Sequence, residues 1–165
     1  MEYGKTPIEA SSLNEAISIY LENETTSKIE INKFSFKDFI DNKLLVINSI
    51  RRGLTYNLFN TIMLFSPFSE EEWADYLDIS SKSLQRYKKQ ENFHFKSIHS
   101  EKILEIAEVT ALGKDIFDTN EQFYSWLKTP SLVFNNLTPA ELLKDSYGKS
   151  LIMDELNRIE HGVFA

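Results

Sequence analysis

The chain has 165 residues, which is enough for one domain, or two small ones, with a substantial hydrophobic core. Apolar residues make up 42% and aromatic residues 13%, which excludes a disordered composition, and the absence of cysteine excludes disulfides and thiol chemistry. The net charge of −7 argues against a protein that wraps a polyanion with its whole surface.

The N-terminal segment is expected to be mainly helical. Ser12 and Glu15 have the spacing of a capping box, which predicts a helix from there to about Glu22. The polar stretch NETTSK interrupts this pattern. The next segment, KIEINKF at residues 28–34, is consistent with a short strand.

Two further helices are expected before the middle of the chain. From Phe36 the apolar residues again follow a helical period, and Gly53 stands where a C-terminal glycine ends a helix. Residues 56–65 form a second apolar, amphipathic segment, which Pro67 terminates.

The middle of the chain begins with a clear helix start. Ser69 and Glu72 form a capping box, and the acidic residues of the first turn are favoured by the helix dipole, so they indicate a helix start rather than a metal site. We expect this helix to reach Leu77 and, after a tight turn, a second helix to run from Ser80 to about Gln90.

The pattern remains helical in the next part of the chain. A longer helix is expected from Ser97 to Leu112, ended by Gly113, and a short one over residues 121–127. The stretch PSLVFNN at residues 130–136 is expected to be a loop.

The C-terminal segment has its own start and stop signals. Thr138, Pro139 and Glu141 are a strong helix start, Gly148 is expected to break that helix, and a last helix runs to about Glu160. Its apolar residues fall at helical spacing and share one face: Ile152, Leu156, Ile159 and Val163. The predicted fold class is therefore all-α.

Signals for export, membrane insertion and enzymatic chemistry are missing. No apolar run approaches the roughly 18 residues of a membrane helix, and the N-terminus lacks the pattern of a signal peptide, so we expect a cytoplasmic protein without a membrane partner. The sequence has no phosphate-binding loop, no dinucleotide-binding turn, no HExxH and no GxSxG. His94, His99 and His161 lack the spacing of a helical metal pair. We expect no catalytic residue, no metal and no cofactor.

Residues 74–87, ADYLDISSKSLQRY, have the pattern of a helix-turn-helix. Ala74 is small where the helices cross, Ile79 fills the turn, and Leu84 and Tyr87 face the core. Residues 80–102 also hold six basic and two acidic residues, a local positive surplus on an acidic chain. The outer face of the second helix would enter the major groove of DNA, and the candidate DNA-binding residues there are Ser81, Lys82, Gln85, Arg86 and Lys89. An ordinary helical hairpin with a solvated basic face is the alternative.

One position departs from the usual helix-turn-helix pattern. Asp78 stands where glycine is common at the turn. Aspartate tolerates the left-handed conformation better than most residues, so we expect the turn to form.

The C-terminal block resembles the toxin-binding domain of the Xre/MbcA/ParS family of bacterial antitoxins. The resemblance depends on the order and spacing of Trp126, Leu127, Pro130, Leu137, Thr138, Pro139, Leu142, Leu143, Gly148, Leu156, Ile159, Glu160, His161 and Gly162. Residues 53–112 resemble the Xre-type helix-turn-helix half of these proteins, whereas residues 1 to about 50 match nothing in the family. In the loop PSLVFNN the family usually has an asparagine after the proline and a Gly-Gly pair, for which Asn135 and Asn136 are expected to supply the backbone freedom.

The resemblance implies an antitoxin that pairs with a RES-domain toxin, an enzyme that consumes NAD or uses it for ADP-ribosyl transfer. Such antitoxins block the toxin's NAD pocket with the C-terminal domain, and their other half generally dimerises and represses the operon by binding operator DNA. The implied organisation is an N-terminal extension, mainly helical, at residues 1–52, an Xre-like helix-turn-helix domain at 53–113 and a toxin-binding domain at 114–165. We therefore expect a homodimer within a larger toxin–antitoxin complex.

The candidate toxin-binding residues lie in the C-terminal domain: Trp126, Arg158, Glu160, His161, Gly162, Val163, Phe164 and Ala165. The apolar end after Gly162 suggests a docking surface, with Phe164 as an aromatic anchor, although it could also fold back on its own domain. Trp126 is more often a core residue in such a short helix. The alternative function is a stand-alone helix-turn-helix transcription regulator whose C-terminal domain dimerises or senses a ligand, and a weaker one is an enzyme with an unrecognised site.

Overall fold

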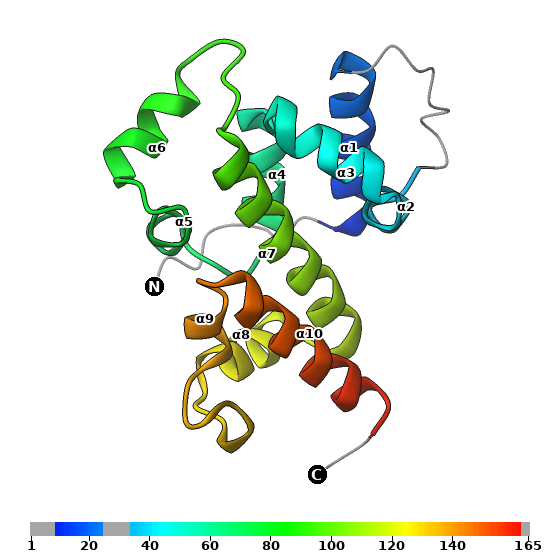
Figure 1. Cartoon of the computed structure of the whole chain (residues 1–165), viewed down its shortest axis with the longest axis vertical. Helices are drawn as coiled ribbons and strands as arrows, with labels where there is room; N and C mark the ends of the chain where they lie inside the picture. The colour runs from blue at the N-terminus through cyan, green and yellow to red at the C-terminus, as the bar shows by residue number, and fades with distance from the viewer. Residues whose placement is uncertain (1–8, 25–33, 163–165) are drawn as a thin grey trace.

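The structure is a computed structural model in which residues 9–24 and 34–162 are described (Figure 1). Within these ranges the regular elements are helices. One isolated antiparallel β-bridge pairs Thr55 with His94. In chain order the helices are α1 (Ala10–Glu24), α2 (Phe36–Asp41), α3 (Lys43–Arg52), α4 (Tyr56–Phe65), α5 (Glu70–Tyr76), α6 (Ser81–Lys88), α7 (Ser97–Ile116), α8 (Asn120–Lys128), the short 3-10 helix η2 (Leu132–Phe134), α9 (Pro139–Leu142) and α10 (Ser146–Glu160). The predicted all-α class is confirmed.

Helix α7 is the element around which the others are arranged. It spans 20 residues and runs through the centre of the molecule, where α3, α4, α8 and α10 pack against it (Figure 1). Its buried residues recur along most of its length, among them Ile103, Ile106 and Val109. A helix that is contacted on several sides loses the polar face of a surface helix, which explains this apolar pattern.

The core is one continuous cluster that is rich in aromatic rings. Phe59 meets Trp73 edge-to-face with 5.3 Å between ring centroids, and it meets Phe95 at 5.0 Å. Leu13 and Ile17 of α1 belong to the same cluster and are 1% and 0% exposed. The N-terminal extension therefore contributes a layer of the core, because α1 packs on α4.

Two expectations for the N-terminal segment are corrected by the structure. Helix α1 begins at Ala10, so Ser12 lies inside its first turn instead of capping it. The helix expected from Phe36 to Gly53 is divided in two, because the side chain of Asn42 caps the amide of Leu45 and starts a new helix. The strand expected at residues 28–34 lies outside the described residues except for its last position.

Two expected glycine breaks are also wrong. Gly113 lies inside α7, and Gly148 lies inside α10. A Cβ at Gly113 would be 2.2 Å from the ring of Phe123, and one at Gly148 would be 1.9 Å from the carbonyl oxygen of Leu142. Both glycines are therefore required for close packing rather than for ending a helix.

Several start and stop signals are confirmed. Helix α4 has the expected bounds, and the capping boxes of Ser69 and Thr138 are both formed. Gly53 follows α3 with a φ of +91°, and Gly162 follows α10 with a φ of +66°. Asn135 also adopts a positive φ of +55°, and its neighbour has the same sign, as the missing Gly-Gly pair required.

No helix within the described ranges is both long enough and apolar enough to cross a membrane.

Candidate functional site

The helix pair, which we define as α5, α6 and the turn between them, has the geometry expected from the sequence. Asp78 adopts the left-handed conformation with a φ of +51°, and the amide of Ile79 donates to the carbonyl of Ala74 at 3.0 Å. Ser80 then caps α6 by accepting from the amide of Ser83 at 3.1 Å. Leu84 is fully buried, so α6 is anchored by its inner face.

The outer face of α6 carries the candidate DNA-binding side chains on one exposed surface. All of them are exposed: Ser81, Lys82, Gln85, Arg86 and Lys89. The amide of Gln85 contacts the carboxylate of Glu70 on α5, and the guanidinium of Arg86 lies over the ring of Tyr87, 5.4 Å from its centroid. The arrangement presents positive charge and hydrogen-bond donors on a fixed helix, which is what a phosphate backbone and base edges require.

The helix pair is connected to the C-terminal helices by polar contacts of α5. The hydroxyl of Tyr76 donates to the carbonyl of Ala140 at 3.1 Å, and the hydroxyl of Tyr124 donates to Glu72 at 3.2 Å. Burial tends to raise the pKa of Glu72, but hydrogen bonds, led by that from Lys128 and including one from the amide of Ser69, outweigh it and lower that pKa. Glu72 is therefore held ionised between α5 and α8.

Trp126 is placed mainly by packing within the protein. Its ring is half-buried and lies 6.3 Å from that of Phe123 and 5.7 Å from that of Phe117. This agrees with the interpretation of Trp126 as a core residue. A contact between its remaining exposed surface and a toxin stays a prediction.

The other candidate toxin-binding residues lie at the end of α10. Arg158 is half-buried, and its Nη1 lies 3.0 Å from a carboxylate oxygen of Glu155 one turn earlier. Glu160, His161 and Gly162 are exposed. The candidate residues Val163, Phe164 and Ala165 lie outside the described residues.

Sequence reasoning missed the exposed Tyr147 and Leu151 on α10, which together with the half-buried Arg158 form what we call the α10 strip. Tyr147 is 91% exposed and Leu151 is 51% exposed. Spacings of four and seven residues place the three side chains on one face of the helix, opposite the buried Ile152 and Leu156. The signal in the sequence was an apolar pair four residues apart, outside the predicted core face.

A second group of exposed apolar side chains lies on the loop around η2. Leu132 is 87% exposed, Val133 is 51% exposed and Leu137 is 43% exposed. The loop is rigid in spite of its exposure, because the amide of Ser131 donates to the carbonyl of Leu137 at 3.1 Å and the amide of Asn136 donates to the carbonyl of Ser131 at 2.8 Å. The C-terminal region therefore displays apolar side chains on two separate structural supports.

Metal-binding geometry is not found in the described ranges, where no three histidine or acidic side chains converge on one point. His94 is bound instead by Glu24 and by the carbonyl of Asn92. The acidic first turn of α5 forms a capping box, as expected from the sequence.

Comparisons with known proteins show similarity to antitoxins. Residues 112–162 match the family described as the antitoxin Xre/MbcA/ParS C-terminal toxin-binding domain. A curated relative, "Antitoxin Xre" of Yersinia enterocolitica, is 26% identical over 122 residues, which are 73% of this chain and 82% of the relative. A chain in the crystal structure of the M. tuberculosis MbcT–MbcA toxin–antitoxin complex is 23% identical with a TM-score of 0.47, over 73% of this chain and 94% of that chain. The family match and the curated relative confirm the resemblance seen in the sequence.

Proposed function

We propose that this chain, an antitoxin of the Xre/MbcA/ParS type, neutralises a partner toxin by direct contact through its C-terminal helices. The observation that carries this proposal is the α10 strip, which lies inside the range matched by the toxin-binding domain. A tyrosine that is 91% exposed packs very little against the described part of its own chain. Exposed aromatic and arginine side chains are the usual anchors of protein interfaces.

The way α10 is held supports a rigid binding surface. Its opposite face buries Ile152 and Leu156 completely, and Gly148 allows the start of the helix to approach the carbonyl of Leu142. Lys149 forms an ion pair of 2.7 Å with Glu108 of α7. Because the backbone of α10 is fixed in this way, a partner that binds Tyr147 and Leu151 has only their side chains to order.

The proposed partner is a RES-domain toxin that uses NAD, and neutralisation occurs by blocking access to its NAD pocket. The exposed end of α10, comprising Glu160, His161 and Gly162, leads from the α10 strip into the last three residues of the chain. Phe164 in that tail is the candidate side chain for entering the pocket. Arg158 precedes that tail in the sequence and is the candidate for pairing with acidic or polar groups at the pocket mouth.

We further propose that the chain represses its own operon as a dimer through α6. The support is the exposed outer face of α6, with Arg86 and Lys89 among its basic side chains, and the fixed geometry of the helix pair. The polar contacts of Glu72 and Tyr76 link α5, the other helix of the pair, to α8 and α9, so the two proposed surfaces lie on directly connected helices.

The test is co-expression with the neighbouring gene product, followed by an NAD consumption assay with and without this chain. Replacing Tyr147 and Leu151 by serine is expected to weaken toxin binding about 10- to 1,000-fold, measured as the Kd of the purified pair. Leu44→Ser is the matched control, because Leu44 is a leucine on α3 that is 74% exposed. Equal affinities for the double variant and the control would contradict the role of the α10 strip.

The pocket-blocking mechanism is tested separately by shortening the chain. A variant that ends at Gly162 retains the α10 strip but lacks Phe164. We expect it to bind the toxin and to leave NAD consumption running, because access to the pocket is restored. Full inhibition by this shortened chain would show that the tail is not the blocking element.

A further inference from the structure

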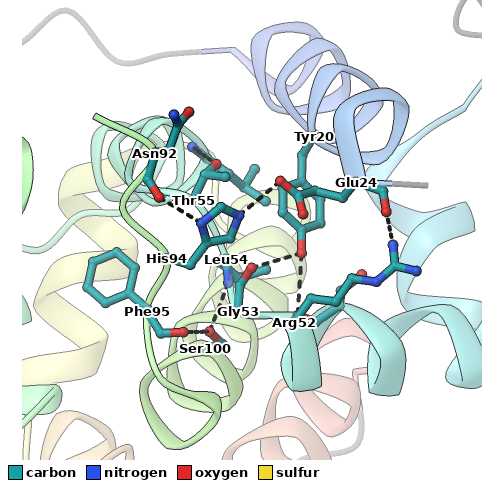
Figure 2. A network of polar contacts seen from close by, with 12 residues as sticks. Tyr20, Glu24, Arg52, Gly53, Leu54, Thr55, Asn92, His94, Phe95 and Ser100 are labelled. Atoms are coloured by element: carbon teal, nitrogen blue, oxygen red, sulfur yellow. Dashed lines mark hydrogen bonds and ion pairs between the residues drawn. The ribbon is translucent and has the colours of Figure 1, made fainter. Parts of the chain in front are cut away.

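A polar joint connects the end of α1 to the connector between α6 and α7, which we define as residues 89–96. Figure 2 shows the imidazole of His94 between Glu24 on one side and Asn92 on the other. Nε2 of His94 lies 2.9 Å from the carboxylate oxygen Oε1 of Glu24, and Nδ1 lies 2.9 Å from the carbonyl oxygen of Asn92. Seventy residues separate Glu24 from His94 along the chain.

The chemistry of these two contacts determines the charge of the ring. A carboxylate and a carbonyl are both hydrogen-bond acceptors, so each nitrogen of His94 faces an acceptor. A neutral imidazole has one N–H donor and one lone pair, whereas the imidazolium has two N–H donors. Only the protonated ring satisfies both contacts at 2.9 Å.

The surroundings stabilise the same charged form. Hydrogen bonding to Glu24 raises the pKa of His94, against partial burial, which lowers it. The titratable side chains that line the same groove, of about 850 Å³, are Tyr20 and Glu24 of α1, Tyr56 of α4, Lys88 at the end of α6 and Glu91 of the connector. From α3, Arg52 contacts the backbone carbonyl of Glu24. Lys96 and His99 are the next charged and titratable residues on the α7 side.

The joint lies directly behind the helix pair. The ring of Phe93 stacks on that of Tyr87 of α6 with 4.0 Å between centroids. The amide of Tyr56 donates to the carbonyl of Phe93, and the amide of Phe95 donates to the carbonyl of Leu54. The connector is thus packed between α6 and the start of α4, and Glu24 attaches α1 to it.

We infer that His94 is doubly protonated in the folded protein and that loss of its proton loosens the joint between α1 and the connector behind α6. Deprotonation leaves one nitrogen with its lone pair directed at an acceptor, so one of the two contacts must open. The other contact loses its charge. Docking of the N-terminal helix α1 therefore depends on pH, independently of the identity of the toxin.

The direction of the pH dependence follows from the raised pKa of His94. The stabilising effect is complete below the unfolded value of about 6.5 and is lost as the pH rises through the folded value. Side chains of His94 and Glu24 are 32% and 22% exposed, so the proton exchanges with solvent. Acidification therefore tightens the joint, and alkalinisation weakens it.

The first experiment is NMR titration of the histidine rings in the full-length chain. Long-range proton–nitrogen spectra at pH 6 are expected to show both ring nitrogens of His94 protonated, with a pKa above about 6.5. A neutral tautomer of His94 at pH 6 would overturn the inference. His94→Gln identifies the signals of this ring among the three histidines.

The second experiment is amide hydrogen exchange of α1 and the connector between pH 6 and 8.5, corrected for intrinsic rates. We assume that His94 titrates like an ordinary histidine, with a pKa of about 6.5, when the joint is open. As the pH rises, the protection factors of the amides should then fall. The largest possible fall is a factor of ten raised to the difference between the measured pKa of His94 and about 6.5. Glu24→Gln keeps an acceptor oxygen without the charge, so it should reduce that factor. This variant also keeps the test available if His94→Gln does not fold. His161→Gln, at the exposed histidine that follows α10, should leave the factor unchanged. Protection that does not depend on pH in the unaltered chain would contradict the proposed joint.

Discussion

At the scale of single residues, Gly113 and Gly148 are required because their missing side chains allow two helices to touch other parts of the chain. The ring of Phe123 occupies the space beside Gly113, and the backbone of Leu142 occupies the space beside Gly148. The far end of the Phe123 ring belongs to a side chain and can rotate away, although by more than a few tenths of an ångström because the gap is 2.2 Å, whereas a backbone carbonyl of a capped helix moves only together with α9. Gly148 is therefore the more demanding position.

Gly148→Ala is expected to lower the free energy of unfolding by about 1–3 kcal/mol, because the new Cβ would lie 1.9 Å from the carbonyl oxygen of Leu142. Chemical denaturation measured by circular dichroism checks this value. Ser150→Ala, at an exposed position of the same helix, should change it by less than about 0.5 kcal/mol. Equal stability of the two variants would show that α9 moves away at little cost.

At the scale of elements, α6 combines an anchored inner face with an unobstructed outer face. Leu84 is buried and Ser80 caps the helix, so the position of α6 does not depend on the residues that point outward. Substitutions on the outer face should consequently leave the fold unchanged and alter only what the helix binds.

Replacing Arg86 and Lys89 by alanine should weaken binding to the DNA upstream of the operon, because two contacts of positive charge with phosphates or base edges are lost. Each phosphate contact removed should also reduce the dependence of log K on log salt by about one unit. Gel shifts at several salt concentrations measure both effects. Lys37→Ala removes an exposed positive charge from α2 and serves as the control. An unchanged shift for the double variant would refute the placement of α6 in the groove.

At the scale of the whole molecule, Glu72 connects the helix pair to the C-terminal helices. It accepts the capping hydrogen bond of Ser69 and the hydroxyl of Tyr124, and it forms an ion pair with Lys128. Together with the hydrogen bond from Tyr76 to Ala140, these contacts join α5 directly to α8 and α9 in the C-terminal part of the chain.

Glu72→Gln keeps an acceptor for the capping box and removes the ion pair with Lys128. Both side chains are partly exposed, so we expect a loss of only about 0.5–1 kcal/mol of unfolding free energy at pH 7. The pKa of Glu72 is lowered from its ordinary 4.5, so its stabilising effect is present above that value and disappears as the pH falls through the folded value. Urea denaturation between pH 3 and 7 measures this.

Glu71→Gln is the matched control, because Glu71 is exposed in the same first turn and shares the same helix dipole. The difference between the two variants isolates the contacts of Glu72 with α8. A difference that persists unchanged at pH 3 would contradict an electrostatic origin.

Local patterns in the sequence determined much of the backbone of this protein. We could predict the capping box of Ser69 because its hydrogen bonds join residues only three positions apart. We could predict the left-handed conformations of Asp78 and Asn135 because the residue type and the local turn decide the sign of φ. The helix pair with its buried Leu84 and exposed basic face follows from helical spacing alone. The family resemblance of the C-terminal block likewise depended on short-range order and spacing.

Contacts between distant segments decided the rest, because a sequence pattern does not say which surface meets which. Glycine is the residue type that commonly ends a helix, but in the tertiary structure Gly148 lies inside α10, where Leu142 approaches it closely. Tyr147 is exposed because α7 covers the other side of α10. Glu24 and His94 form one joint only through the packing of α1 on α4, so the charge of that histidine is a property of the tertiary structure.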